Sequence, residues 1–206
     1  MPRRIPQQKR GERRVAALLD SAASVIAECG YEAATMSSIA ERAGASIGSL
    51  YQFFPNKESV TQALRTQYGK QFEELWAPLE AEAKTLSLGH LVNRFVDMTI
   101  DFVDDHPALL PLMDAPSTTR NPPIRRHLRK LVASFFLAKR PRMSKAKALR
   151  FATVTLQIIR GLNAIYVEAG PEEKAYFVHE FKVVLLCYFT SKIGLPDASD
   201  RKLERK

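Results

Sequence analysis

The chain has 206 residues, of which 46% are hydrophobic, and this is enough apolar material for a core and excludes disorder of the whole chain. The formal net charge of +9 is concentrated in two segments: residues 1–14 carry six Lys or Arg against one Glu, and residues 120–150 carry eleven and no Asp or Glu. Such local basicity favours an anionic partner and does not bear on the fold.

The start of the chain and its two cysteines exclude further classes. Residues 1–11 are basic with no apolar segment behind them, so we predict a flexible arm and no secretory signal. The longest nearly uncharged stretch, residues 151–167, is short and contains Arg160, which disfavours a membrane span. Cys29 and Cys187 lie far apart in apolar surroundings, so we expect two core residues and no disulfide. These features predict a soluble, cytoplasmic protein.

The N-terminal part of the chain predicts one long helix followed by two short ones. Apolar residues recur every three or four positions over residues 12–29, which predicts an amphipathic helix that ends at Gly30. Thr35 stands at the N-cap position of a second helix, and Gly44 ends that helix. Ser46 then caps a third helix of similar length.

The rest of the chain keeps the helical period. No segment alternates with a period of two, so no strand is predicted. A long helix is expected to begin at Lys57, with weak points at Gly69 and Pro78. Further helices are expected over residues 88–102, 108–114, 124–138, 144–169 and 172–193, and a disordered tail over residues 195–206. The fold class is therefore all-α, with about nine helices.

The two short helices form the most informative motif. Two short helices joined by a tight turn with glycine are typical of the DNA-reading helix-turn-helix. Ala40 supplies a small residue where the helices touch, Gly44 supplies the turn, and Leu50 supplies a buried aliphatic side chain on the second helix. An ordinary αα-hairpin would use similar spacing, so this pattern alone leaves both interpretations open.

The flanks favour DNA binding. The run "GYEAATMSSIAERAG", the helix "SIGSLYQFF" and the "NKE" that opens the next helix, within Arg13 to Gln62, closely resemble the N-terminal domain of the tetracycline-repressor (TetR) family of transcriptional regulators. The resemblance implies a helix-turn-helix domain over residues 12–56 and a larger helical domain for ligand binding and dimerisation over residues 57–194. It also implies a homodimer that places two recognition helices in successive major grooves of a pseudo-palindromic operator. The expected function is that of a repressor that a small molecule releases from its operator.

Side-chain chemistry assigns roles within this motif. Hydroxyls and a lysine suit phosphates and set the register, whereas exposed side chains of the second helix suit base edges and set the sequence preference. The expected DNA contacts are Thr35, Ser46, Ile47, Gly48, Ser49, Tyr51, Gln52 and Lys57. Phe53 stands where the family usually has Tyr or His, so we expect it to pack instead of contacting phosphate. The basic arm either follows the DNA backbone or remains a solvated tail.

The larger domain offers candidates for an effector site and for dimerisation. Aromatic bulk with a few polar tips is typical of small-molecule pockets, although the same residues suit a plain core. The candidates are Trp76, Phe95, Met98, Phe102, Met113, Phe136, Asn163 and Tyr166. The last two helices carry more apolar surface than one subunit can cover, which predicts a homodimer through them.

An enzyme and a helical adaptor for other proteins are the alternatives. The four histidines are scattered without metal-ligand or triad spacing, and no glycine-rich phosphate loop is present. No catalytic residue, metal site or cofactor is therefore predicted. An adaptor would leave the polar second helix of the motif and the basic arm unexplained.

Overall fold

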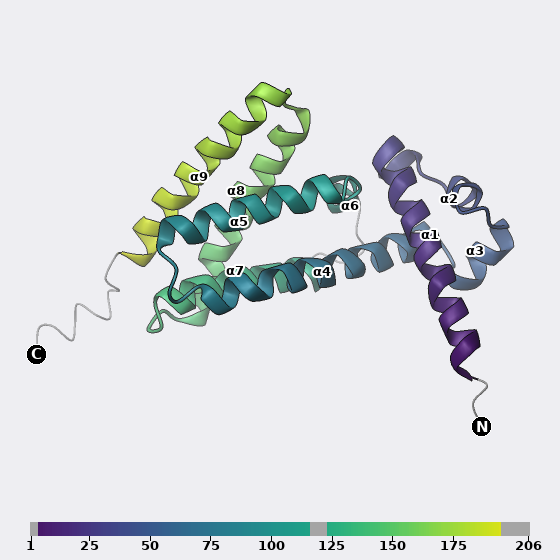
Figure 1. Cartoon of the computed structure of the whole chain (residues 1–206), viewed down its shortest axis with the longest axis horizontal. Coiled ribbons are helices and arrows are strands. Elements are labelled where there is room, and N and C mark those ends of the chain that lie inside the picture. Colours follow the sequence, from purple (N-terminus) through teal and green to yellow (C-terminus); the bar gives the residue numbers. More distant parts are fainter. Residues whose placement is uncertain (1–3, 116–122, 195–206) are drawn as a thin grey trace, which may run out of the picture. The chain divides into compact units, whose positions relative to one another are not determined.

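A computed structural model describes residues 4–115 and 123–194, and in these ranges the chain forms nine α-helices and no strand (Figure 1). The chain divides into two compact units. Within the described ranges, the first unit comprises residues 4–70 and 103–115, and the second comprises residues 71–102 and 123–194. The predicted all-α class is confirmed. The tail predicted over residues 195–206 lies outside the described residues.

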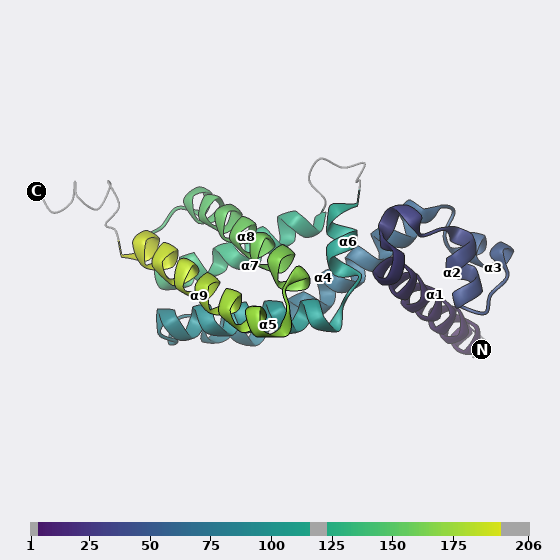
Figure 2. The same ribbon diagram turned by 90° about the horizontal axis from the view of Figure 1, so that it is seen from above.

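The first unit contains the predicted motif and two further elements. Its helices are α1 (Arg4–Ala33), α2 (Met36–Arg42), α3 (Ile47–Phe53), the first turns of α4 (Lys57–Glu82) and α6 (Leu109–Asp114). Both views show α2 and α3 beside α1 (Figures 1 and 2). Fully buried side chains such as Leu18, Ile26, Ile39 and Leu50 form the core. This unit therefore places the second helix of the motif on a small apolar core.

Helix α1 begins earlier than the sequence predicts. It starts at Arg4, so residues 4–11, expected as a flexible arm, are helical. Pro6 does not prevent this, because the first turn of a helix has no intrahelical partner for the backbone N–H that proline lacks. Gly30 has φ 78° and ψ 169°, and this non-helical conformation breaks the helix where the sequence predicts an end.

Helix α6 is fixed to α4 by a buried cation. The Arg65 side chain is 7% exposed, and its guanidinium donates to the backbone carbonyls of Leu112, at 3.1 and 2.8 Å, and Ala115, at 3.3 Å. These carbonyls lie at the end of α6, where helical hydrogen bonding runs out. A buried guanidinium costs much free energy unless it is hydrogen-bonded, so α6 and the first turns of α4 form one connected element.

The second unit is a helical bundle around aromatic side chains. It contains the remainder of α4, most of α5 (Leu88–Asp105), α7 (Pro123–Lys139), α8 (Lys145–Glu168) and α9 (Pro171–Ile193). The Trp76 ring is fully buried, stacks on Phe135 at 4.2 Å between centroids and meets Phe95 edge-on at 5.4 Å. Such pairs stabilise a core beyond the area that they bury.

The long helix expected from Lys57 is confirmed, and α4 continues through both weak points, Gly69 and Pro78. Pro78 is exposed, so the carbonyl that it leaves without a helical partner can face solvent. The expectation for the two cysteines is wrong. Cys29 on α1 and Cys187 on α9 are exposed instead of buried. The core faces of these helices are occupied by neighbouring positions, such as Ile26 on α1 and Leu185 on α9, so the apolar surroundings in the sequence misled the prediction.

Candidate nucleic-acid interface

The first helix of the motif, α2, begins with reciprocal capping. Thr35 has extended backbone angles, and its Oγ1 accepts a hydrogen bond from the Ser38 backbone N–H at 3.0 Å. The Ser38 Oγ in turn accepts from the Thr35 N–H at 3.1 Å. The predicted N-cap is thus confirmed, and it fixes the residue at which α2 starts. The Thr35 side chain is exposed, as its expected phosphate contact requires.

The turn between α2 and α3 is a Schellman motif. Gly44 has φ 55°, a left-handed conformation that glycine adopts without a Cβ penalty. Its N–H donates to the Glu41 carbonyl at 3.0 Å, and the Ala45 N–H donates to the Ala40 carbonyl at 2.9 Å. Ala40 itself is buried, as the predicted helix contact requires. The turn therefore ends α2 with its carbonyls bonded and redirects the chain at once into α3.

Helix α3 presents most of the predicted base-reading residues to solvent. Ser46 is its N-cap, with Oγ accepting from the Ser49 N–H at 3.2 Å, and Leu50 is fully buried beneath it. Ile47 is 41% exposed and Tyr51 is 51% exposed. Gly48 and Gln52 are exposed as well, whereas Ser49 is half-buried. One side of α3 thus docks through Leu50 while the other carries groups that can reach base edges.

Phe53 does not pack as expected. Its side chain is 38% exposed, and the buried aromatic at the end of α3 is the next residue, Phe54, at 7%. Leu50 and Phe54 are four positions apart and both are buried, so these two side chains lie on the docked side of the helix. Phe53 is rotated by about 100° from Phe54 on a helix, which leaves an apolar ring exposed at the end of the reading helix.

Lys57 is engaged inside the protein and not directed at a partner. Its Nζ donates to the backbone carbonyls of Tyr31 at 2.8 Å, Glu32 at 3.1 Å and Ala34 at 3.0 Å. The ammonium also lies 4.3 Å from the centroid of the Tyr31 ring. The structure therefore gives Lys57 a different set of contacts from the phosphate contact that the sequence predicts.

An ion pair joins α2 to α1. The Arg42 guanidinium donates to both carboxylate oxygens of Glu28, at 2.6 and 2.5 Å. Hydrogen bonding to Arg42 lowers the pKa of the Glu28 carboxyl below its ordinary value and raises the pKa of Arg42. Both side chains are about half exposed, so solvent weakens the attraction, but the bidentate geometry fixes the orientation of α2.

Two groups of cations stand out in the described part of the first unit. Arg42, Lys57 and Arg65 bind carboxylates or carbonyls of the same unit. Lys9 and Arg10 on the first turns of α1 are exposed, as is Arg13, which completes a basic stripe. Positive charge that can reach a partner therefore gathers on α1 instead of on the motif itself.

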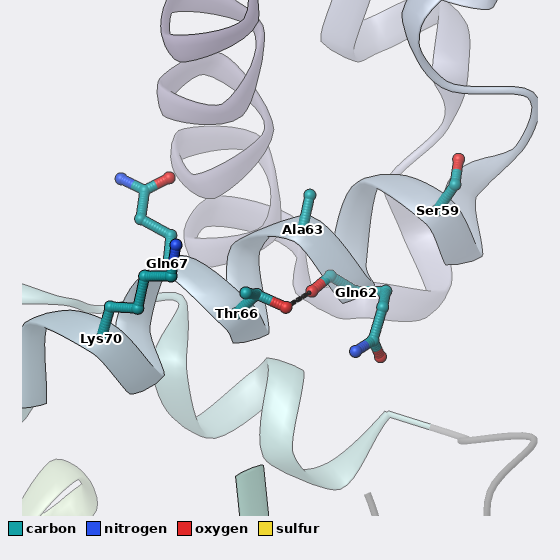
Figure 3. A pocket seen from close by; sticks show the side chains of 6 residues that line it. All are labelled: Ser59, Gln62, Ala63, Thr66, Gln67 and Lys70. Atoms are coloured by element: carbon teal, nitrogen blue, oxygen red, sulfur yellow. Dashed lines mark hydrogen bonds between the residues drawn. The ribbon is translucent and has the colours of Figure 1, made fainter. Parts of the chain in front are cut away.

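A hollow of about 500 Å³ lies beside α4 in the first unit (Figure 3). It is lined by the side chains of Ser59, Gln62, Ala63, Thr66, Gln67 and Lys70. The Thr66 hydroxyl donates to the backbone carbonyl of Gln62 at 2.8 Å, so part of this polar lining is already bonded to its own helix. None of the eight predicted effector residues lines this hollow.

The predicted effector residues are mostly in the second unit. Six of them are buried there: Trp76, Phe95, Phe102, Phe136, Asn163 and Tyr166. Met98 packs half-buried against the same core, whereas Met113 lies on α6, in the first unit. Sequence reasoning missed Phe135, which contacts both Trp76 and Phe95. Its position within the apolar stripe of α7 was the available signal.

Helices α8 and α9 expose a broad apolar surface. The exposed large side chains on them are Val154, Ile165, Val167, Tyr176, Val183, Val184 and Leu186. Tyr176, Val183 and Cys187 are spaced by seven and four residues along α9, so they share one face of this helix. Exposed apolar surface of this extent is typical of protein interfaces.

Among the described residues, no group of three or more His, Cys, Asp or Glu side chains could hold a metal ion. A search of the same residues finds no helix with the length and apolarity needed to cross a membrane.

Two family profiles match the chain. The profile described as "Bacterial regulatory proteins, tetR family" matches residues 18–64, which contain α2, α3 and the start of α4. The profile described as "Tetracyclin repressor-like, C-terminal domain" matches residues 87–189, half of the chain. Both matches fall in the order that the sequence resemblance implies.

Curated relatives match over the N-terminal region. The HTH-type transcriptional repressor KstR of Mycolicibacterium smegmatis is 35% identical over 66 residues, 32% of this chain and 31% of the relative. The A-factor receptor protein of Streptomyces griseus is 35% identical over 79 residues, 37% of this chain and 29% of the relative. The matched part thus spans about a third of the length of these relatives.

Among solved structures, a TetR-family transcriptional regulator from Streptomyces coelicolor aligns with a TM-score of 0.68 at 19% identity. The alignment covers 86% of this chain and 98% of that one. At this identity the likeness shows that the two chains share a fold.

Proposed function

We propose that this chain, which belongs to the tetR family of bacterial regulatory proteins, is a transcriptional repressor that binds a pseudo-palindromic operator as a homodimer and is released by a small molecule. The observation that carries the proposal is the exposure of Ile47, Gly48, Tyr51 and Gln52 on a short helix whose opposite side is docked by Leu50. A glutamine amide can pair with an adenine edge, and an isoleucine can contact a thymine methyl.

The basic helix α1 supplies the electrostatic part of this proposal. Helix α1 contains residues 4–11 as well as the later residues, so Lys9, Arg10 and Arg13 all lie on one helix. They therefore cannot enter a DNA groove as an extended, flexible arm would. Both views show the first turns of α1 projecting beyond the packed part of the first unit (Figures 1 and 2). We therefore assign these cations to the phosphate backbone that flanks the bases read by α3.

The effector proposal rests on the aromatic core of the second unit. Trp76 and Asn163 are buried there, and within the described part of the chain neither Trp76 Nε1 nor Asn163 Oδ1 has a hydrogen-bond partner. Buried polar atoms are nearly always bonded in proteins. An apolar small molecule that carries a hydrogen-bonding group would suit these side chains, and the name of one relative, the A-factor receptor protein, agrees with ligand binding.

The dimer proposal rests on the exposed apolar faces of α8 and α9. An isolated subunit would leave Val183 and Val184 in water, together with the 61% exposed side chain of Tyr176. Pairing of these faces between two copies would bury them and would bring two reading helices to one operator. A regulator of this type acts on chromosomal DNA, so the proposal places the protein in the cytoplasm.

A gel shift on the promoter beside its own gene tests the DNA-binding function. We expect saturable, sequence-dependent binding, and Gln52→Ala should weaken it by about tenfold at its cognate site, since it removes a base contact. Gln62→Ala is the matched control, because Gln62 is an exposed glutamine on α4 of the same unit and lies outside the motif. Equal and unspecific retardation by all three proteins would favour the adaptor or enzyme alternatives.

A further inference from the structure

We infer that Lys57 is a positioning residue, which fixes the recognition motif in place and makes no contact with a phosphate. The inference rests on the proposed DNA-binding function and assigns a role within it that differs from the one expected of a lysine at the edge of such a motif. It follows from the contacts of this side chain, its burial and the chain segments that it joins.

The hydrogen-bonding capacity of Lys57 is fully used. A lysine ammonium has three donor hydrogens, and Nζ has three backbone carbonyls within 3.1 Å, those of Tyr31, Glu32 and Ala34. The Tyr31 ring lies 4.3 Å from the same atom and adds a cation–π contact. A phosphate could bind Lys57 only after these contacts were broken.

The three carbonyls need this partner. They follow the break at Gly30, in the last residues of α1 and the connection to α2, where carbonyls have no further helical turn to bond. Two of these carbonyls, those of Tyr31 and Ala34, belong to part-buried contacts with Lys57. A Met side chain at position 57 would fill similar space without a donor, and it would leave the carbonyls unsatisfied.

The position of Lys57 explains why this matters for DNA reading. Residues 31–34 lead into the Thr35 cap of α2, and Lys57 is the first residue of α4. The start of α4 is fixed by its own cap, in which the Asn56 Oδ1 accepts from the Ser59 N–H at 2.8 Å. The Lys57 ammonium thus joins the two ends of the motif α2–turn–α3 by hydrogen bonds. Loss of these hydrogen bonds would let α3 rotate relative to α1.

Salt dependence separates positioning from phosphate binding. Operator affinity of the full chain is measured by fluorescence anisotropy over a range of salt concentrations, with a labelled duplex from its own promoter. Lys57→Met should lower the affinity by about tenfold or more at every salt concentration, which is the loss expected when charge-assisted hydrogen bonds are removed. The slope of the logarithm of affinity against the logarithm of salt concentration should stay unchanged. Arg13→Met is the matched control, and it should lower the slope by about 0.9 for each phosphate that is no longer neutralised.

A conservative variant gives a second readout. Lys57→Arg keeps the charge, and a guanidinium binds phosphate well, so a phosphate contact would survive this change. A planar guanidinium does not reproduce the three convergent donors of the ammonium, so a positioning role predicts that Lys57→Arg fails to restore affinity. Restored affinity in Lys57→Arg, or a slope that falls in Lys57→Met as it does in Arg13→Met, would overturn the inference.

A measurement without DNA keeps this result distinct from the proposed function. In ¹⁵N-glycine-labelled protein the nine glycines give a sparse amide spectrum. Lys57→Met should shift Gly44 in the turn and Gly48 in α3, whereas Gly161 and Gly170 of the second unit should stay in place and report intact folding. Unmoved Gly44 and Gly48 signals would refute positioning. A wild-type protein that binds no operator while its glycines shift in Lys57→Met would refute only the proposed function.

Discussion

The reading motif and the core of the second unit are stabilised in opposite ways. The helix ends of the motif depend on short-range hydrogen bonds: the Thr35 cap, the Schellman turn at Gly44 and the Ser46 cap each join residues at most five positions apart. The second unit depends on aromatic contacts such as Trp76 with Phe135, which lie on different helices. Local bonding fixes a surface without much buried area, so the outer side of α3 can remain polar and exposed.

This difference predicts the largest effect in the second unit. Trp76→Ala removes a fully buried ring that stacks on Phe135, and we expect a loss of about 3–5 kcal/mol in the free energy of unfolding. Urea unfolding followed by circular dichroism measures the loss. Trp76→Phe keeps an aromatic ring, so its loss in the free energy of unfolding should be clearly smaller. Equal stability of Trp76→Ala and wild type would show that the core does not depend on this stack.

The motif should show a smaller effect that depends on backbone conformation and not on volume. A Cβ added at Gly44 would meet no atom within 4 Å, so Gly44→Ala costs only the left-handed backbone, on the order of 1 kcal/mol. Gly44→Asn should cost less, because asparagine tolerates this conformation. Thermal unfolding compares the two variants. A larger loss in Gly44→Asn would show that bulk at the turn, and not its backbone angle, is limiting.

The same contrast explains what the sequence could predict. The caps at Thr35 and Ser46, the turn at Gly44 and the docked Leu50 were all predictable, because each depends on residue type within one or two helical turns. The helical start of α1 was not predictable from charge, because a basic segment with no apolar stretch indicates a flexible arm, although nothing in residues 4–11 prevents a helix.

Long-range contacts limit what can be predicted from the sequence. The contacts of Lys57 join positions 23 to 26 residues apart, and no local pattern reveals that three carbonyls converge on its ammonium. The exposure of Phe53 and the assignment of Met113 to the first unit instead of the second depend on how helices pack. Helical period alone places a side chain on one face of its helix and cannot say which unit covers that face.

The Glu28–Arg42 pair should give the smallest effect and a distinct pH dependence. The folded pKa of Glu28 is lowered by Arg42, so the pair adds stability above the ordinary pKa of a glutamate and loses it as the pH falls through the lowered value. Glu28→Gln should therefore melt at a slightly lower temperature than wild type at neutral pH, and the two melting temperatures should converge in acid.

Glu41→Gln is the matched control for this prediction. Glu41 is an exposed acid on α2, so this substitution removes the same charge outside the pair. High salt should also narrow the difference in melting temperature between Glu28→Gln and wild type, since both partners are about half exposed. A difference that persists in acid and in salt would mean that Glu28 stabilises α2 by packing instead of charge.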